Sequence, residues 1–255
     1  MKKISFAIIG YGRFGELFAK ILAPFGNVLI VSKRKIKGVR QIKYNDLKNI
    51  DVVIPTVPIS KFEEVIKKIA PHLKKKSLVM DVCSVKEIPC KIMKKYIPKS
   101  IEILGTHPMF GPDSTKNGLC GLQIAICPLR ISKGTMSRTQ KMFKKMGLKI
   151  IGTTPREHDR QAAKCLALVH FLGRGLAKAI KKQNITSLGY ERLLAVNETV
   201  NNDTWQLFFD MQHFNPYSAR ERKKFIQELK KIDQKIVDNK NIININIKFK
   251  NKRKT

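Results

Sequence analysis

Short apolar runs alternate with segments of helical periodicity along the first 153 residues. The runs read as buried strands over 3–9, 27–31, 52–55, 77–80, 101–104, 123–126 and 149–151. The intervening segments are amphipathic, and Ser60 with Glu63 three residues later predicts a capping box at the start of one helix. Alternating strands and helices with short connections predict a doubly wound, Rossmann-like parallel sheet.

After Pro155 the strand pattern ends, and helices are expected near 156–182, 187–200, 204–213 and 219–237. Pro155 and Pro216 would stand at helix starts. We therefore predict an α/β protein, with a dinucleotide-binding Rossmann-like domain over 1–153 and a smaller all-helical domain over 154–237. Several of these helical faces are too apolar for so small a domain to bury alone, which predicts a homodimer formed through the helical domain.

Residues 238–255 are basic and rich in Asn. Apolar residues alternate with polar ones at Ile243, Ile245, Ile247 and Phe249, as in a half-buried strand at a sheet edge. The alternative is a largely disordered tail, which is the interpretation we favour.

Charge and cysteine content narrow the classes of protein. Lys and Arg number 51 against 19 acids, a net charge of +32, which raises nucleic-acid binding as a hypothesis. The lysines are spread along the whole chain instead of forming one stripe, so we expect no nucleic-acid partner, although a basic surface also attracts anionic substrates. The five cysteines include no C-x-x-C pair, which predicts reduced thiols, a cytoplasmic location and no metal site. No run reaches the ~18 apolar residues of a membrane span.

A glycine motif follows the first predicted strand and opens a helix. It has the form G-x-G-x-x-G and comprises Gly10, Tyr11, Gly12, Arg13, Phe14 and Gly15. Its glycines allow a tight turn, close approach of a pyrophosphate and helix–strand packing, which predicts dinucleotide binding. Thr56 and Pro58 follow the third strand at the same edge of the sheet, where they either contact the cofactor or form an ordinary turn.

The end of the second strand bears on the choice of cofactor. NAD enzymes place an acid there to bind the ribose 2′-hydroxyl. This chain instead has Ser32, Lys33 and Arg34, one hydroxyl and two cations that suit a 2′-phosphate. The sequence therefore favours NADP over NAD.

Two polar segments follow predicted strands on the ligand-binding edge. They are Asp81-Val82-Cys83-Ser84-Val85-Lys86 and Gly105-Thr106-His107-Pro108-Met109-Phe110-Gly111-Pro112. The prolines and glycine would stiffen the second loop and hold His107 at a fixed angle. A histidine can take a proton from a hydroxyl as hydride leaves the same carbon, with Ser84 hydrogen-bonding nearby. We therefore predict His107 and Ser84 as catalytic residues.

With these motifs the chain resembles the prephenate/arogenate dehydrogenase family. The matching pieces also include Glu157-His158-Asp159-Arg160, which leads to His170. The resemblance implies an NAD(P)-dependent oxidative decarboxylation in tyrosine biosynthesis, with prephenate or arogenate as substrate. It implies that His107 is the base, that Ser84 orients the ring hydroxyl and the nicotinamide, and that His170 helps bind substrate.

Several of the implied roles have alternatives. His170 lies on an apolar helix face, where a buried structural histidine is the usual interpretation, and Asp159 and Arg160 could serve helix-end electrostatics. The Leu166–His170 run and the loop 111–118 look closer to the arogenate-type, NADP-using branch. The family's substrate-carboxylate arginine has no sure counterpart, and its candidates are Gln212, Arg220 and Arg222. The choice between prephenate and arogenate stays open.

Two other classes of protein compete with this hypothesis. One is a non-catalytic Rossmann-type binding or regulatory protein that uses its basic surface, against which the set Ser84, His107 and His170 argues. The other is a different Rossmann oxidoreductase of a hydroxy or imino acid. A catalytic lysine on the long helix would favour that class of enzyme, but Lys164 and Lys178 lie in no recognisable motif.

Overall fold

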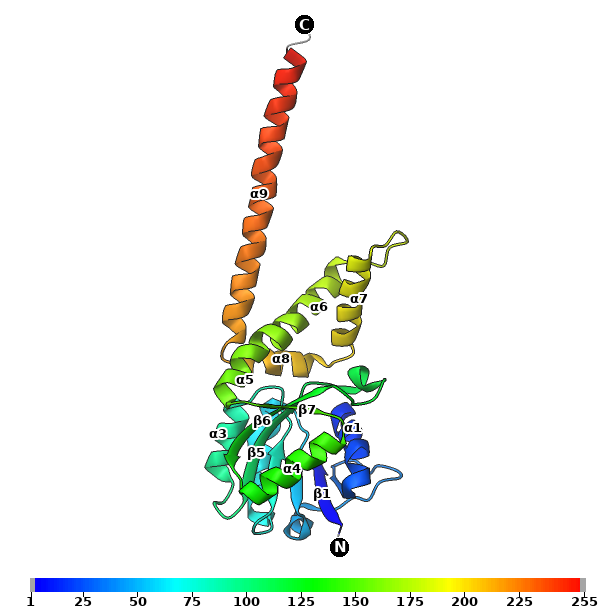
Figure 1. Ribbon diagram of the computed structural model, residues 1–255, viewed down its shortest axis with the longest axis vertical. Coiled ribbons are helices and arrows are strands. Elements are labelled where there is room, and N and C mark those ends of the chain that lie inside the picture. Colours follow the sequence, from blue (N-terminus) through cyan, green and yellow to red (C-terminus); the bar gives the residue numbers. More distant parts are fainter. Residues whose placement is uncertain (1–2, 253–255) are drawn as a thin grey trace.

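A seven-stranded sheet with the strand order β2-β1-β3-β4-β5-β6-β7 forms the N-terminal part of the molecule (Figure 1). The structure, a computed structural model, describes the backbone of residues 3–252 and the side chains of residues 3–198 and 200–239. The strands are β1 (Ile4–Ile9), β2 (Gly26–Val31), β3 (Val52–Pro55), β4 (Leu78–Asp81), β5 (Glu102–Pro108), β6 (Gln123–Arg130) and β7 (Lys149–Gly152). The predicted α/β class and Rossmann-like order are confirmed.

One strand pair departs from the predicted parallel sheet, because β5 and β6 are antiparallel. Residues 109–122 connect them and contain only the short 3-10 helix η4 (Pro112–Thr115). A parallel return usually runs through a crossover α-helix, and this connection has none, so the chain turns back and β6 pairs alongside β5 in the opposite direction. The same pairing extends β5 beyond the predicted 101–104, so that His107 lies within the strand, opposite Ala125.

Helices cover both faces of the sheet. On one face, α1 (Arg13–Leu22) and α4 (Lys133–Lys145) pack on a cluster that includes Phe6, Ile8, Phe18 and Phe143. On the other face lie α2 (Ile59–Ile69) and α3 (Glu87–Tyr96), together with the 3-10 helices η2 (Tyr44–Asn49) and η3 (Ala70–His72). A third 3-10 segment, η1 (Ala23–Phe25), links α1 to β2.

The predicted capping box at Ser60 is wrong. Helix α2 begins at Ile59, with Pro58 as its N-cap residue, two residues before the predicted cap. The Ser60 N–H and hydroxyl both donate to the Asp210 carboxylate, at 3.2 and 3.3 Å. The Asp210 carboxylate, 150 residues away in sequence, therefore accepts the free Ser60 N–H in the first turn of α2. It takes the place of the predicted local cap.

The second part of the chain is helical. It comprises α5 (Pro155–Ala162), the π-helical segment η5 (Ala163–Ala167), α6 (Leu168–Ala179), α7 (Leu188–Asn201), α8 (Trp205–Phe214) and α9 (Ser218–Lys252). Pro155 is the first residue of α5, as predicted, and the Thr154 side chain caps this helix. The long helix expected over 156–182 contains the π turn and ends at Ala179. Within the described residues no helix is both long and apolar enough to cross a membrane.

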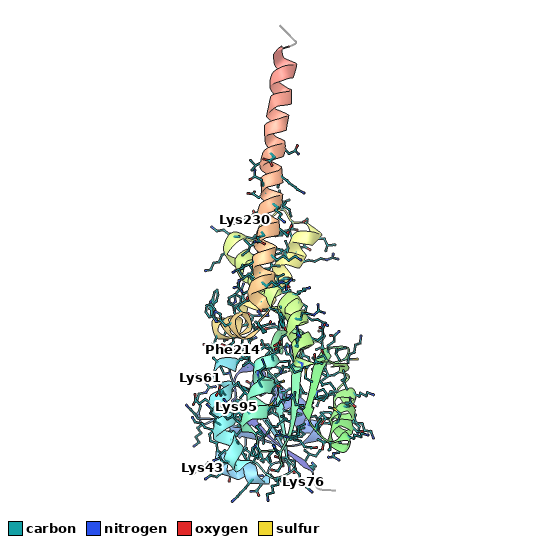
Figure 2. All side chains as sticks on the ribbon, turned by 90° about the vertical axis from the view of Figure 1, so that its left-hand side faces the viewer. Lys43, Lys61, Lys76, Lys95, Phe214 and Lys230 are labelled. Atoms are coloured by element: carbon teal, nitrogen blue, oxygen red, sulfur yellow. The ribbon has the colours of Figure 1, made fainter. Side chains whose placement is uncertain are left out.

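Helix α9 projects far from the rest of the molecule (Figures 1 and 2). It continues through Lys252, so neither the predicted end at 237 nor the tail, whether disordered or a strand, is found over 238–252. Residues 218–252 contain no Gly or Pro, the two residues that most often end a helix. Each further residue therefore adds another hydrogen bond to the existing helix. Residues 253–255 of the predicted tail lie outside the described residues.

Candidate functional site

The glycine motif forms the turn between β1 and α1. Gly10 has a positive φ of 98°, and its N–H donates to Val31 O at 3.0 Å. A Cβ on Gly10 would lie 2.8 Å from Thr56 O, and one on Gly15 would lie 2.6 Å from Gly10 O. Thr56 Oγ1 donates to Gly10 O at 2.8 Å, so this side chain shapes the turn. The turn therefore requires glycine at both positions.

Gly12 differs from the other two glycines. It is the N-cap residue of α1, and no described atom lies within 4 Å of a Cβ placed on it. The first N–H groups of a helix point outward with a positive dipole end, which favours an anion there. The open space at Gly12 thus fits the close approach of a dinucleotide pyrophosphate.

Two alanine substitutions separate these roles. We expect Gly12→Ala to fold with nearly unchanged stability but to bind the dinucleotide more weakly, because the methyl group occupies the ligand's space. We expect Gly15→Ala to lower the melting temperature, because its methyl group meets backbone. Calorimetric titration with NADP⁺ and thermal unfolding measure the two effects. Equal cofactor affinity of Gly12→Ala and wild type would contradict the assignment.

The end of β2 forms a basic loop beside the glycine motif. The Arg34 N–H donates to Ser32 Oγ at 3.2 Å, and the Arg34 guanidinium donates to Tyr11 O at 3.3 Å. Ser32, Lys33 and Arg34 line one depression together with Lys35, Gln41, Ile42, Lys43 and Asp46. Asp46 is the acid in this set, and its carboxylate accepts the Lys43 N–H at 2.8 Å. The cationic side chains at this loop suit a phosphate group.

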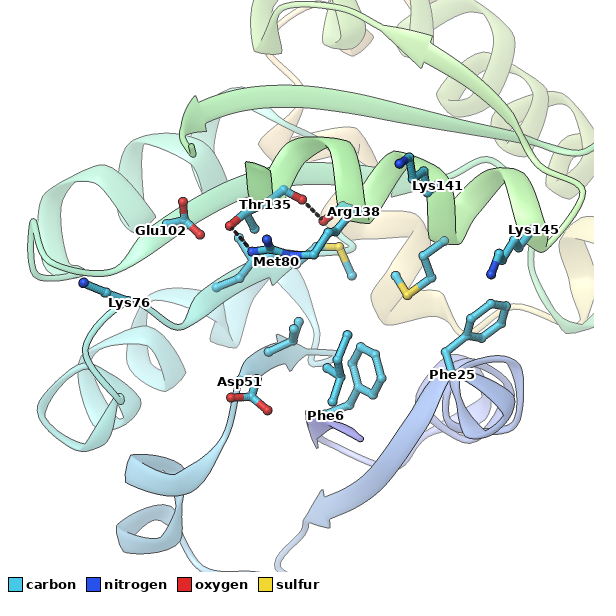
Figure 3. A pocket seen from close by; sticks show the side chains of 15 residues that line it. Phe6, Phe25, Asp51, Lys76, Met80, Glu102, Thr135, Arg138, Lys141 and Lys145 are labelled. Carbon is cyan, nitrogen blue, oxygen red and sulfur yellow. Dashed lines mark hydrogen bonds between the residues drawn. The ribbon is translucent and has the colours of Figure 1, made fainter. Parts of the chain in front are cut away.

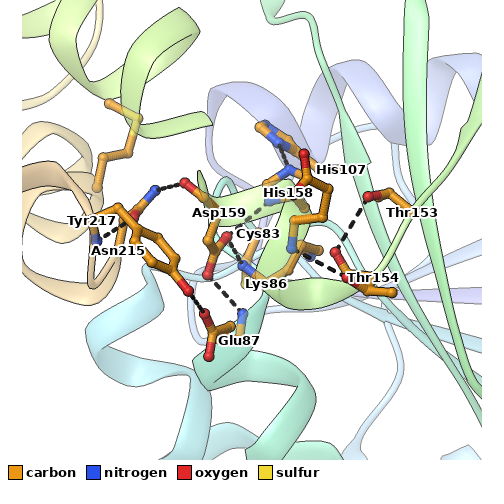
Figure 4. A network of polar contacts seen from close by, with 12 residues as sticks. Cys83, Lys86, Glu87, His107, Thr153, Thr154, His158, Asp159, Asn215 and Tyr217 are labelled. Atoms are coloured by element: carbon orange, nitrogen blue, oxygen red, sulfur yellow. Dashed lines mark hydrogen bonds and ion pairs between the residues drawn. The ribbon is translucent and has the colours of Figure 1, made fainter. Parts of the chain in front are cut away.

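A buried chain of hydrogen bonds leads to His107 (Figure 4). His107 Nδ1 lies 2.8 Å from His158 Nε2, and His158 Nδ1 lies 2.8 Å from Asp159 Oδ1. All three residues are at most 6% exposed. The Asp159 carboxylate also accepts the N–H groups of Lys86 and Glu87, at 2.7 and 2.8 Å. Asp159 thus caps α3 from a distance and anchors the two histidines.

The hydrogen bonds assign the proton positions of this chain. The Asp159 carboxylate accepts two backbone N–H groups at the start of α3 and accepts the His158 Nδ1–H as well. His158 Nε2 then serves as the acceptor toward His107, which donates from Nδ1. This leaves a lone pair on His107 Nε2. Burial, and secondarily the electrostatic interactions with His158 and with the Lys86 ammonium, hold the pKa of His107 well below its usual value of 6.5. The ring is therefore a neutral proton acceptor at neutral pH.

A second buried pair supports the same strand ends. The Lys86 ammonium is fully buried, pairs with the Asp81 carboxylate and donates to Thr106 O at 2.5 Å. Thr106 Oγ1 in turn donates to Asp81 O at 2.5 Å. These contacts join β4, β5 and the start of α3. The Ser84 hydroxyl, on the same segment, is buried without a hydrogen-bond partner among the described residues, so it is free for a ligand.

The helical part contributes a second polar cluster. His170 Nε2 lies 3.9 Å from Asp203 Oδ2, and Arg174 donates to Asp203 O at 2.5 Å. The Arg174 guanidinium lies 4.1 Å from the ring centroid of Trp205. His170 Nδ1 and Arg174 Nε are buried and have no hydrogen-bond partner in the described part of the chain. Burial, assisted by Arg174, lowers the pKa of His170 to about 4, so its ring is neutral.

Arg13 joins the glycine motif to this cluster. Its guanidinium pairs with Asp113 at 2.8 Å and with Asp203 at 3.4 Å, and it donates to Asn202 O. The loop after β5 and the turn between α7 and α8 therefore both meet the first turn of α1. His170 lies beside this contact through Asp203.

The structure separates the three substrate-carboxylate candidates. Gln212 is buried and donates to Ala167 O at 2.8 Å, and Arg222 donates to Gln212 Oε1. Arg220 is exposed and makes no hydrogen bond to that pair in the described structure. None of the three has a hydrogen bond to the His107 chain or to the His170 cluster among the described residues.

Sequence reasoning missed His158, Lys86, Arg174 and Asp203 as site residues. Little in the sequence indicated them. His158 and Asp159 are neighbours near the start of a helix, where an acidic residue is common for electrostatic reasons alone. Asp159 in fact caps α3 instead of its own helix, and Arg160 pairs with Glu157 at 2.8 Å.

A Rossmann-like sheet, an open glycine turn and a buried histidine at a strand end are the features of nicotinamide-dependent oxidoreductases. The prephenate dehydrogenase nucleotide-binding domain matches residues 31–152, and the TYRAAT1-like C-terminal domain matches residues 176–245. The chain belongs to the prephenate/arogenate dehydrogenase family.

Individual relatives agree with this assignment. The probable arogenate/prephenate dehydrogenase of Methanocaldococcus jannaschii is 31% identical, over 91% of this chain and 56% of its own length. The chloroplastic arogenate dehydrogenase 2 of Arabidopsis thaliana is 30% identical, over 84% of this chain and 64% of its own length. The chain thus spans less than two thirds of the length of either relative.

Solved structures share the fold. The prephenate dehydrogenase of A. aeolicus, crystallised with hydroxyphenyl propionate and NAD+, has a TM-score of 0.74 at 17% identity and covers 94% of this chain and 92% of its own. The Synechocystis arogenate dehydrogenase has a TM-score of 0.68 at 19% identity, with 93% of each chain covered.

Proposed function

We propose that this chain is a dehydrogenase of tyrosine biosynthesis that oxidatively decarboxylates a cyclohexadienol, either arogenate or prephenate. The observation that carries the proposal is the buried Asp159–His158–His107 chain, which presents a neutral proton acceptor at the ligand-binding edge of the sheet. A bound nicotinamide supplies the hydride acceptor. His107 Nε2 takes the proton of the ring hydroxyl, Ser84 orients that hydroxyl, and the ring carboxylate leaves as CO₂ as the ring becomes aromatic.

We further propose NADP as the cofactor. The support is the basic loop of Ser32, Lys33 and Arg34 beside the glycine motif, where an NAD enzyme has an acid. Lys33 and Arg34 form no ion pair among the described residues, so both charges are available for a 2′-phosphate.

A spectrophotometric assay tests both proposals. NADP⁺ or NAD⁺ is supplied with prephenate or with arogenate, and nicotinamide reduction is followed. We expect turnover with at least one substrate and a higher kcat/KM with NADP⁺ than with NAD⁺. Absence of reduction in all four combinations would overturn the enzymatic function, and a preference for NAD⁺ would overturn only the cofactor proposal.

Between the two substrates, we propose arogenate as the preferred one, because its side chain carries an ammonium and a carboxylate. The support is the cluster on the helical part, in which Asp203 offers an anion and Arg174 a cation with an unpartnered Nε. Burial, followed by the charge of Asp113, raises the pKa of Asp203, and Arg13 and Arg174 oppose this rise. An ammonium group would compensate the half-buried carboxylate.

Replacing Asp203 by Asn is expected to lower kcat/KM for arogenate by about tenfold to hundredfold, the loss of one hydrogen bond to a charged group. The value for prephenate, which has no ammonium, should fall less. Asp113→Asn is the matched control, because it removes the other acid at Arg13 without touching His170. It should leave the ratio between the substrates unchanged. An equal loss for both substrates in Asp203→Asn would refute this role.

We also propose that two copies of the chain associate through the helical part. Helix α9 carries an apolar stripe at Phe225, Leu229, Ile232 and Ile236, with the spacing of 4, 3 and 4 residues seen in paired helices. The last three side chains are each about half exposed, at 49%, 56% and 55%. Light scattering on the purified enzyme should give twice the chain mass, and a monomeric mass would contradict the proposal.

The five free cysteines suit a reducing compartment, so we propose that the protein acts in the cytoplasm.

A further inference from the structure

A pocket opens at the amino edge of the sheet (Figure 3). Four of its lining residues, Ile4, Val52, Leu78 and Glu102, are the first residues of β1, β3, β4 and β5. The glycine motif and Ser84 follow the opposite, carboxyl ends of β1 and β4. The pocket is therefore a different place from the proposed active site. Its volume is about 450 Å³.

The fold explains why this space exists. The crossover helices of the middle strands, α2 and α3, both lie on the other face of the sheet. On the face that carries the pocket, α1 and α4 pack toward opposite edges of the sheet, and no crossover helix of β3 or β4 lies between them. Phe6, Leu78 and Met80 of the sheet thus form an apolar floor, with Phe25 and Met142 beside it.

The rim of the pocket is cationic. Arg138, Lys141 and Lys145 recur every three or four residues along α4 and so share one face of that helix, and Lys76 lies across the opening. None of these four cations forms an ion pair in the part of the chain whose side chains are described.

The two acids that line the pocket already have partners. Asp51 pairs with Lys74 at 2.6 Å and accepts the Ser5 hydroxyl at 2.9 Å. Glu102 accepts the Ser132 N–H at 2.7 Å. The rim therefore keeps a surplus of positive charge above an apolar floor.

We propose that this pocket is a binding site for a small amphipathic carboxylate, with an aliphatic or aromatic body on the apolar floor and its anionic head at the α4 cations. Burial of the body against Phe6, Leu78 and Met80 supplies hydrophobic free energy. The head meets Arg138 and Lys141, which favours an anion over a neutral molecule of the same shape. The hydroxyls of Thr135 and Thr139, on the α4 side of the pocket, are hydrogen-bonded within α4, so this side offers a polar ligand few free groups besides the cations.

Calorimetric titration of the full chain, saturated with NADP⁺, tests the site with three probes: octanoate, 1-naphthylacetate and 1-octanol. We expect one carboxylate to bind per chain, about tenfold more tightly than 1-octanol, a ratio that corresponds to ~1.4 kcal/mol. Octanoate and 1-naphthylacetate distinguish an aliphatic from an aromatic body, and saturable binding of either supports the site.

Variants locate the binding on the molecule. The double variant Arg138→Glu, Lys141→Glu should weaken carboxylate binding at least about tenfold. Lys144→Glu is the matched control, because Lys144 is exposed on the same helix outside the pocket lining, and we expect a change within about twofold. Met142→Trp, which fills the pocket, should also abolish binding. No binding, equal affinity for octanoate and 1-octanol, or affinity unchanged by the charge reversal would overturn the proposal.

Discussion

Replacing His107 by Asn is expected to lower kcat by about 10²–10⁴-fold, the usual contribution of a general base, with NADP⁺ affinity unchanged. Asparagine keeps a hydrogen-bonding side chain of similar size next to His158, but it cannot accept the proton of the ring hydroxyl. The loss should appear equally in kcat and kcat/KM, because the lost interaction belongs to the transition state. Steady-state kinetics and calorimetry measure the two quantities.

The matched control is His213→Asn, because His213 is exposed, stacks on Phe209 and makes no hydrogen bond to His107, His158 or Asp159 among the described residues. It should retain wild-type turnover. Near-normal kcat in His107→Asn would remove His107 from the reaction.

The pH profile gives an independent measure of the same base. Burial lowers the pKa of His107 well below 6.5, so the neutral, proton-accepting form is already dominant at pH 6.5. Activity should therefore fall only as the pH drops through the lowered pKa, and it should not rise between about pH 6.5 and 8 because of this group. An acid limb of kcat/KM centred near an ordinary histidine pKa would contradict the assigned environment.

Replacing Lys86 by Met is expected to lower the free energy of unfolding by about 3–5 kcal/mol, the typical cost of removing one partner of a buried ion pair. Lys86 and Asp81 are both 0% exposed, so Met would leave the Asp81 carboxylate without its cation in the core. Thr106 O, next to His107, would also lose its donor. Urea unfolding at neutral pH measures the change.

Two further variants separate charge from packing. Adding Asp81→Asn to Lys86→Met removes the uncompensated charge and should recover part of the lost stability. Lys91→Met is the surface control, because Lys91 is largely exposed and pairs with Glu87 at 3.7 Å, so its change should stay within ~0.5 kcal/mol. A Lys86→Met protein as stable as the Lys91→Met protein would show that the buried pair contributes no net stability.

Local sequence signals were sufficient for most of the sheet. The apolar runs predict all seven strands, and the glycine motif lies between β1 and α1 where its pattern requires. The direction of β6 was not predictable from its own residues, because an apolar run reads the same in parallel and antiparallel pairing. The absence of a crossover helix between β5 and β6 decides that direction.

The candidate site was predicted only in part. Ser84 and His107 are recognisable from polar residues that follow apolar strands, although their catalytic roles remain predictions. The partners of His107 were not recognisable, because His158 and Asp159 lie 51 and 52 residues further along the chain. Their side chains reach β5 only because α5 packs against α3.

The amino-acid sequence by itself determined the family and the strand-and-helix order, because these depend on local periodicity and residue chemistry. It also predicted which residues bind phosphate or accept a proton. Only the tertiary structure decided which donors and acceptors meet. Three contacts join residues that are distant in sequence: Asp210 accepts the Ser60 N–H at the start of α2, Asp159 caps α3, and Arg13 pairs with Asp203. Buried polar groups need partners, and the packing of helices determines from which part of the chain each partner comes.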